Sequence, residues 1–224
     1  MAQDAPVIDG WPPGERTRIR RLPDRASYER ADVYAVVDAA ITCNVGYVID
    51  GRPYVTPTAL WRDGDRIYWH GSAASRFLRQ VVGQEACVSV HLIDGLVLAR
   101  SGFEHSMNYR SATLFGRVEA VADRDKRAQL DAFIDKLVPG RSAELRAPTE
   151  QELKQTTVLA MNVEEASAKV RAHGVVDKPE DFDAPVWAGI LRVETRLREL
   201  LPDAEVPVRA APSAVLAALV SKTL

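Results

Sequence analysis

The residues best suited to chemistry lie in one short polar stretch, HGSAASR, in the first half of the chain. Gly71 lets the backbone approach a ligand closely, Ser72 and Ser75 supply hydroxyl groups, and Arg76 supplies a guanidinium. A helix predicted over residues 74–82 would add its N-terminal N–H groups, which attract anions. Together these groups suit a phosphate cradle. The alternative is that the serines only cap the helix and Arg76 is a solvated charge, and local chemistry alone favours this alternative because such caps are common.

Two predicted strands position this polar stretch. Residues 54–61 and 66–70 are rich in β-branched and aromatic side chains, as strands are. Between them, Asp63-Gly64 is a pair typical of a tight hairpin turn. The sequence therefore predicts a β-hairpin whose second strand leads directly into the polar stretch and its helix.

The rest of the chain alternates further strands with short helices. Helices are predicted over 27–40, with Ser27 as the N-cap, over 123–138, and at a Thr-x-x-Glu capping box at 149–152. Strands are predicted at 41–50, 86–94, 96–99, 111–122 with Gly116 as a bulge, 156–163 and 167–171. The segment 102–109 is predicted as an irregular connection. Closely spaced strands without strict βαβ alternation predict a mainly β fold, a barrel or sandwich with peripheral helices.

The chain divides into three predicted segments. Residues 1–26 are rich in Pro, Arg and Asp and are expected to form an N-terminal arm over the surface. Residues 27–195 hold the predicted strands and form the main domain. Residues 196–224 form a C-terminal extension that ends in a short apolar stretch at 214–220.

Charge and hydropathy exclude several classes of partner. The net charge of -2 and the pI of about 6.1 give no electrostatic case for binding nucleic acid or an anionic membrane surface. No apolar run is long enough to span a bilayer, and the N-terminus lacks the apolar region of a signal peptide. Cys43 and Cys87 lie in apolar runs and are expected to be reduced core residues, which fits a cytoplasmic location.

Five ordered segments together resemble a known family. They are VGYV at 45–48, RPYVTPT at 52–58, IYWHGSAASR at 67–76, SMNYRS at 106–111 and VWAGI at 186–190. In this order they are similar to the FMN-binding split β-barrel proteins related to pyridoxamine 5'-phosphate oxidase, and in particular to the flavin-nucleotide-binding branch that includes the nitroimidazole-resistance proteins. The resemblance implies a split β-barrel and a homodimer with two FMN sites at the subunit interface.

The resemblance also implies which residues form the FMN site. Those expected along the isoalloxazine ring are Thr56, Pro57, Thr58, Ala59 and Leu60. Those expected to hold the ribityl phosphate are His70, Gly71, Ser72, Ser75 and Arg76. Those expected near the flavin and the interface, from one subunit or the other, are Asn108, Tyr109, Arg110 and Ser111. Arg110 is expected to neutralise the phosphate or to form an interface ion pair. Trp187 is expected beside the flavin or in the core of the interface.

The predicted function is that of an FMN-dependent oxidoreductase acting on a small molecule, with the flavin supplying the redox chemistry. Ser75-Arg76-Phe77 departs from the Ser-Arg-Lys of pyridoxamine phosphate oxidases proper, so oxidation of pyridoxamine phosphate is not expected. One alternative is a flavin-storage protein without a dedicated substrate. Another is an enzyme that uses the deazaflavin F420, as related split barrels do. Some relatives bind haem, but nothing in this sequence singles out an axial ligand.

His70 is the candidate catalytic residue. It could donate to the phosphate or face the flavin and relay a proton, and the alternative is a structural histidine at the end of a strand. His91 is expected in a strand, His105 in a polar loop and His173 at the surface. The four histidines do not show a metal-binding spacing, so no structural metal is predicted.

Overall fold

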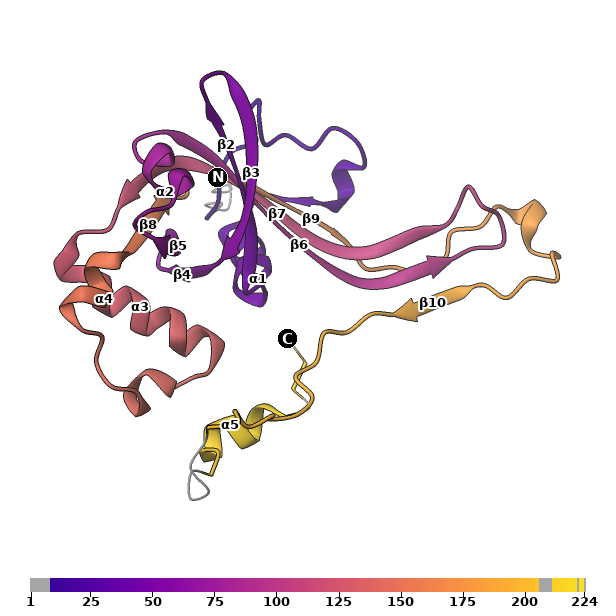
Figure 1. Ribbon diagram of the computed structural model, residues 1–224. Coiled ribbons are helices and arrows are strands. Elements are labelled where there is room, and N and C mark those ends of the chain that lie inside the picture. Colours follow the sequence, from indigo (N-terminus) through magenta and orange to yellow (C-terminus); the bar gives the residue numbers. More distant parts are fainter. Residues whose placement is uncertain (1–8, 206–210, 221, 224) are drawn as a thin grey trace, which may run out of the picture.

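The computed structural model describes residues 9–205, 211–220 and 222–223, and the prediction of a mainly β fold is confirmed (Figure 1). The strands are β1 Ala26–Ser27, β2 Thr42–Ile49, β3 Arg52–Ala59, β4 Trp61–Asp63, β5 Arg66–Ser72, β6 Glu85–Leu98, β7 Ser106–Ala120, β8 Thr156–Asn162, β9 Glu165–Arg171 and β10 Gly189–Arg192. The α-helices are α1 Arg30–Ala39, α2 Arg76–Val81, α3 Asp123–Leu137, α4 Glu150–Gln155 and α5 Ala214–Leu219. Short 3-10 helices are η1 Pro23–Arg25, η2 Arg141–Glu144 and η3 Pro179–Asp181.

The strands form one curved antiparallel sheet in the order β3-β2-β6-β7-β8-β5-β4. Strand β7 lies between β6 and β9 along most of its length, and its last residues pair with β8 instead. This change of partner splits the wall of the barrel, and the predicted split β-barrel is confirmed. Figure 1 shows α3 and α4 beside β4, β5 and β8, whereas β6, β7 and β10 extend on the opposite side as a long arm.

Tight turns set the register of the two hairpins. Ile49 pairs with Arg52, so Asp50 and Gly51 form a two-residue turn, and both have positive φ angles of 51° and 73°. A two-residue turn with this backbone matches the twist of the flanking strands and favours Asp-Gly. Gly64 has a φ of 58° in the turn between β4 and β5, as the sequence predicts.

Two predicted boundaries are wrong. Helix α1 begins at Arg30, because Ser27 belongs to β1, where it pairs with Ala168. The segment 102–109 is not wholly irregular, because β7 begins at Ser106, which pairs with Val97 of β6. Long-range strand pairing decides both boundaries, and local propensity does not reveal it.

The predicted bulge lies at a different place. The pairing of β6 with β7 shifts between Ile93 and Gly95, so the two strands expected at 86–94 and 96–99 form one strand with a bulge. Gly116 has another role. A Cβ atom at this position would overlap the carbonyl oxygen of Asn162, because β8 leaves β7 there at very close range.

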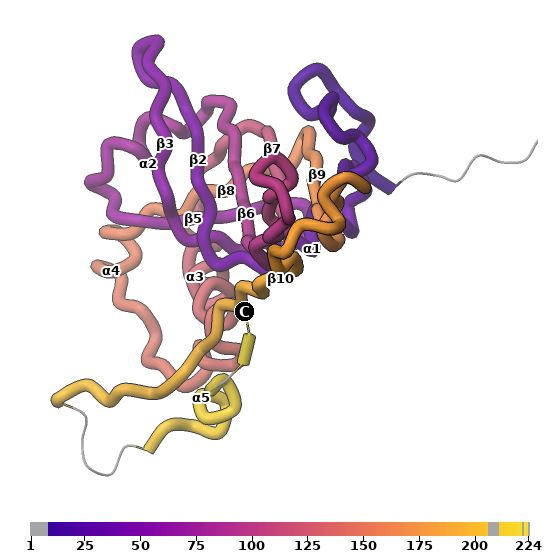
Figure 2. The backbone as a smooth tube through the Cα atoms, turned by 90° about the vertical axis from the view of Figure 1, so that its right-hand side faces the viewer, coloured from indigo at the N-terminus to yellow at the C-terminus, as the bar shows by residue number. Residues whose placement is uncertain are grey.

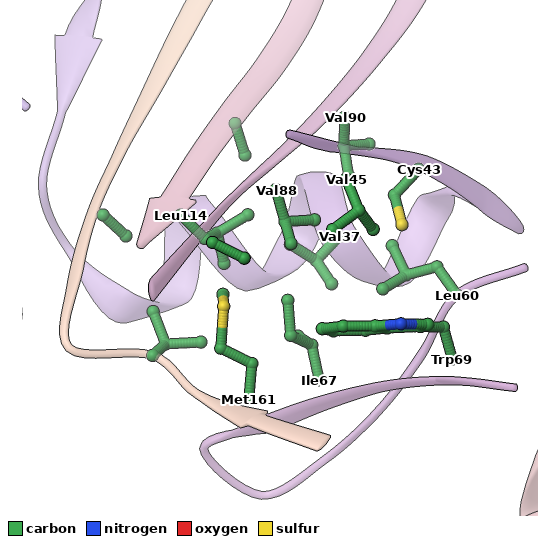
Figure 3. Packing of buried hydrophobic residues seen from close by; sticks show 14 of the residues in the cluster. Val37, Cys43, Val45, Leu60, Ile67, Trp69, Val88, Val90, Leu114 and Met161 are labelled. Carbon is green, nitrogen blue, oxygen red and sulfur yellow. The ribbon is translucent and has the colours of Figure 1, made fainter. Parts of the chain in front are cut away.

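Figure 3 shows part of the closely packed barrel interior, where aliphatic side chains surround the indole of Trp69. Trp69 of β5 and Leu114 of β7 are fully buried, and Val37 brings α1 onto the same cluster. Each such side chain contributes about 1.5–3 kcal/mol by leaving water. Cys43 is a buried free thiol, as predicted, whereas Cys87 is a free thiol that is only partly buried.

Trp11 and Arg16 anchor the N-terminal segment to the barrel, Arg16 through ion pairs with Glu85 and Glu165. Trp11 is 5% exposed, and its indole N–H donates to the carbonyl oxygen of Val163 at 3.1 Å. At the other end, the C-terminal segment leaves the barrel after β10, and α5 lies away from the sheet (Figure 2). The division into arm, domain and extension stays a prediction. None of the described helices has the length and apolar character needed to cross a membrane.

Candidate functional site

The predicted phosphate cradle lies where β5 ends and α2 begins. The Ser75 hydroxyl accepts a hydrogen bond from the backbone N–H of Leu78 at 3.5 Å and so caps α2. The Ser72 hydroxyl accepts from the N–H of Ala74 at 3.2 Å. Both serines therefore make the local capping contacts that the sequence offered as the alternative, and phosphate binding stays a prediction.

Arg76, the cation of this cradle, lies beside a small aromatic cluster. Its guanidinium carbon lies 5.9 Å from the centroid of the Tyr54 ring, which stacks on Tyr47 at 5.6 Å. Tyr47 in turn contacts Phe77 of α2, with ring centroids 4.7 Å apart. Among the described residues Arg76 has no ion-pair partner, so it can pair with an anionic ligand.

The segment expected along a flavin ring runs down β3, at one edge of the sheet. Thr56 and Thr58 share one face of this strand, and the Thr56 hydroxyl lies 3.0 Å from the hydroxyl of Tyr47. Pro57 is exposed, and Ala59 is half-buried. Leu60 differs from its neighbours, because its side chain is fully buried in the barrel core near Trp69 (Figure 3). A ligand on the barrel surface therefore cannot reach the side chain of Leu60.

His70 faces a cavity between β5 and α3. Side chains alternate along this strand, so Trp69 points into the barrel core and His70 points toward α3. The His70 ring lies 4.7 Å from the ring of Phe133 and 5.7 Å from that of Trp61. The cavity has a volume of about 480 Å³, and the apolar side chains that line it are Leu130, Phe133, Ile134, Leu145, Pro148 and Leu153.

The environment of His70 keeps its imidazole neutral. Burial lowers the pKa of His70 from its ordinary value. Its Nδ1 atom is buried and has no hydrogen-bond partner in the part of the chain that the structure describes. A buried polar atom without a partner calls for an explanation, and a neutral imidazole is a good metal ligand. The described residues hold no group of three or more His, Cys, Asp or Glu side chains suited to a metal ion.

One cation stands at the rim of the His70 cavity. Arg146 donates to both carboxylate oxygens of Glu152, at 2.8 and 2.5 Å. Glu152 also accepts from the backbone N–H of Thr149 at 2.7 Å, which completes the predicted capping box of α4. The hydrogen bond from Arg146, supported by that from Thr149, lowers the pKa of Glu152 to about 2. The rim therefore carries a fixed ion pair at neutral pH.

Residues 108–111 of β7, which are expected near the flavin, do not lie beside the cradle of the same chain. Asn108 lies ten residues before Val118 on β7, which is about 33 Å in an extended strand. Val118 is the residue near the cradle, because it hydrogen-bonds to Gly83 and Gln84 just after α2. Residues 108–111 therefore lie at the far end of the barrel.

The contacts of these distant residues are made within the chain. Asn108 is buried and accepts from the Arg171 guanidinium at 2.5 Å. Arg110 forms a two-pronged ion pair with Asp94, at 2.7 and 3.0 Å. The remaining residues of this set are half-buried Tyr109, Ser111, whose hydroxyl donates to the Lys169 carbonyl, and Trp187, which is 67% exposed just before β10.

Sequence reasoning missed the residues that enclose the His70 cavity. The helix predicted over 123–138 has an apolar stripe of Leu130, Phe133, Ile134 and Leu137, which the spacing predicts to pack on the core. In the structure Leu130 and Phe133 are partly buried and pack against Trp61 and Tyr68 of the sheet, and they line the cavity together with Ile134. A sequence signal was present in His70, the single histidine of β5. The sequence does not reveal which face of the strand it occupies.

Comparisons with known proteins place the chain in a family. The family described as pyridoxamine 5'-phosphate oxidase matches residues 29–170. The chain belongs to this family. The resemblance carried by the five sequence segments is thereby confirmed. No curated protein matches the chain.

Two solved structures of this family's fold are similar over almost the whole chain. The flavocytochrome Anf3 from Azotobacter vinelandii is 36% identical, with a TM-score of 0.87, and the match covers 94% of this chain and 99% of that one. The FAD and haem binding protein from Mycobacterium smegmatis is 38% identical, with a TM-score of 0.84, covering 88% and 98%. A 5-nitroimidazole antibiotic resistance protein from Bacteroides thetaiotaomicron shares the fold alone, at 21% identity and a TM-score of 0.54, covering 65% and 86%.

Proposed function

We propose that this chain is a flavocytochrome that binds a non-covalent haem in the His70 cavity and a flavin at the cradle before α2. The observation that carries this proposal is the neutral imidazole of His70 in a cavity with mostly apolar walls, whose other polar lining residues are Asp131, Arg146, Glu152 and Thr156. The relatives described as a flavocytochrome and as an FAD and haem binding protein support it. Cys43 and Cys87 do not form the Cys-x-x-Cys-His motif of covalent attachment, so the haem would be held by contacts alone.

The side chains around the cavity fit a haem. Its volume of about 480 Å³ falls in the range of cofactor sites, about 300–1,000 Å³. The apolar walls from α3 and from residues 145–153 suit a flat macrocycle. His70 offers the one imidazole, and Arg146 offers a cation for a propionate. When bound, the haem would supply one-electron chemistry and a coordination site at its iron.

The protein residues would bind and orient the cofactor. A ring nitrogen of His70 would ligate the iron, and burial keeps that nitrogen unprotonated and available. Phe133 and Trp61 contact the imidazole and restrict its rotation. Arg146 would share its guanidinium between a propionate and Glu152.

We propose FAD as the flavin, because the relative that is 38% identical is described as binding FAD. FMN, which the sequence resemblance implies, is the alternative. Both carry an isoalloxazine ring and a ribityl phosphate, so the same cradle of Ser72, Ser75 and Arg76 would serve either one. Mass analysis of the released flavin distinguishes them.

The position of the two sites supports an oxidoreductase over a storage protein. His70 and Ser72 lie two residues apart on β5, so one strand would join the haem and flavin sites. We also propose a homodimer, because Asn108 and Trp187 lie far from the cradle of their own chain and would reach a flavin only from a second copy. Exposed apolar side chains along the β6–β7–β10 arm, which suit such an interface, include Leu96, Met107, Ile190 and Leu191.

The visible absorption spectrum of the purified protein, with identification of the released cofactors, tests this proposal. We expect a Soret band together with flavin absorption, and FAD and haem b in the extract. Protein that shows no Soret band, even after incubation with hemin, would contradict the haem assignment. The mass of the native assembly in solution then tests the dimer separately.

A further inference from the structure

A second polar hollow lies beneath the N-terminal segment, on the outer face of β7 and β9. Its volume is about 220 Å³. Hydroxyl side chains of Ser111, Thr113 and Ser167 line it from the sheet. The N-terminal segment crosses above this face, and cationic side chains complete the hollow: Arg16, Arg18 and Lys169.

The sheet places these hydroxyls together. Residues alternate along β7, so Ala112 and Leu114 fill the barrel core while Ser111 and Thr113 point outward. Thr113 lies directly opposite Ser167 on β9. Ser167 is only 6% exposed and lines the hollow beside Thr113. A hydroxyl group can both donate and accept hydrogen bonds, so these side chains suit an anionic ligand.

The hollow carries an excess of positive charge. Arg16 is neutralised at its edge by Glu85 and Glu165. Arg18 donates only to the backbone carbonyl of Pro13, at 3.3 Å. Lys169 similarly donates to the carbonyl of Arg21, at 3.0 Å.

The positive charges of Arg18 and Lys169 are not neutralised by these contacts, because both partners are backbone carbonyl groups. In the described chain neither Arg18 nor Lys169 has a carboxylate partner, and no carboxylate lines the hollow. Two free positive charges beside donor hydroxyls match the charge and hydrogen-bonding capacity of a phosphate group, which carries close to two negative charges at neutral pH.

We propose that this hollow is a binding site for a phosphate group, held by Arg18, Lys169 and the hydroxyls of Thr113 and Ser167. The volume is below the range of about 300–1,000 Å³ typical of sites that enclose an organic ligand, so a whole nucleotide would not fit inside. The phosphate is either free inorganic phosphate or the terminal group of a phosphorylated metabolite that projects outward. The site is separate from the cradle before α2, because it is built from β7, β9 and the N-terminal segment.

This site is tested by titrating the flavin-loaded protein with inorganic phosphate. Binding is measured by isothermal calorimetry, in a buffer that itself contains no phosphate. We expect binding without release of flavin. The Arg18→Gln/Lys169→Gln double variant should bind phosphate about tenfold more weakly or worse, because both charges are lost. Lys169→Arg keeps the charge and should retain binding. Arg20 is an exposed cation of the same segment that does not line the hollow, so Arg20→Gln is the matched control.

The outcomes separate the proposal from its alternatives. Equal weakening in Arg20→Gln and in the double variant would indicate general surface charge and overturn it. If phosphate binds only after the flavin is removed, the anion belongs to the cofactor site. If phosphate does not bind at all, the hollow holds only water. Either result would overturn the proposal. Adenosine 5'-monophosphate distinguishes the sources. If adenosine 5'-monophosphate binds with the same affinity as inorganic phosphate, the ligand is free phosphate. If it binds more tightly, the ligand is a phosphorylated metabolite.

Discussion

The imidazole of His70 packs against the ring of Phe133, with centroids 4.7 Å apart and planes inclined by 55°. This contact joins β5, which leads into the predicted flavin cradle, to α3, which lines the apolar cavity. It fixes the only imidazole that lines this cavity at one wall. Because the His70 side chain lies against Phe133, it is available to a ligand in the cavity.

Replacement of His70 tests the haem ligand directly. His70→Gln should abolish or strongly reduce the Soret band, because glutamine is a poor iron ligand and the described lining offers no other imidazole. Flavin content should remain, since His70 contacts Phe133 of α3, whereas Arg76, the cation of the cradle, lies beside Tyr54 of β3. The measurement is the ratio of haem to flavin absorbance in purified protein.

His91 provides the matched control for this substitution. It lies exposed on β6, outside the cavity, so His91→Gln should leave the haem content unchanged. An unchanged Soret band in His70→Gln would remove His70 as the ligand. Loss of the band in both variants would point to general destabilisation.

The lowered pKa of His70 predicts a dependence of stability on pH. Its ordinary value is 6.5, and burial in the folded protein favours the neutral form. The unfolded chain therefore binds the proton more readily as the pH falls below about 6.5. This contribution to the free energy of unfolding is fully present above that pH and is lost as the pH falls toward the folded pKa. Urea unfolding of haem-free protein at about pH 8 and about pH 5.5, on either side of the ordinary value, measures it.

A variant isolates the part of this effect that belongs to His70. His70→Gln does not titrate, so its stability should fall less between the two pH values than that of the unaltered protein. Identical pH dependence in both proteins would show that other groups cause the change.

The sequence predicts the cradle more fully than the cavity. The residues around Arg76 are continuous in the chain, and turn and cap signals locate them on a strand end and a helix start. The cavity combines β5 with α3 and α4, which are far apart in sequence. Helical periodicity identifies Phe133 as apolar, but it does not reveal whether the stripe closes on the sheet or leaves a space for a ligand.

Strand pairing limited the prediction of the fold in a similar way. The Asp50-Gly51 turn was predictable because local backbone geometry selects its residues. The bulge at Ile93 was not, because it depends on the register between two strands. The separation of Asn108 from the cradle likewise follows from the length of β7, which the sequence divided between a connection and a strand.

Replacement of Arg76 tests the flavin cradle. Arg76→Ala should weaken flavin binding, because it removes the one cation that the cradle offers to the phosphate, and charge-assisted hydrogen bonds contribute about 1.5–3 kcal/mol. The dimer and the haem content should be preserved. The measurement is fluorescence titration of flavin-free protein with FAD and with FMN.

Arg79 is the control for this substitution, since it is an exposed arginine on the same helix. Arg79→Ala should leave flavin affinity unchanged within experimental error. Unaltered affinity in Arg76→Ala would exclude Arg76 from the flavin site.

Gly116 should be intolerant of any side chain. A Cβ atom there would overlap the carbonyl oxygen of Asn162, which is backbone and cannot rotate away. Gly116→Ala should therefore lower the free energy of unfolding by about 1–3 kcal/mol, as overpacking does. Gly102 has open space around it, so Gly102→Ala should change stability by less than about 0.5 kcal/mol. Urea midpoints of the two variants, compared at equal cofactor content, measure the difference. Equal midpoints would show that β8 can move away from β7, and that the close approach of the two strands does not depend on a glycine.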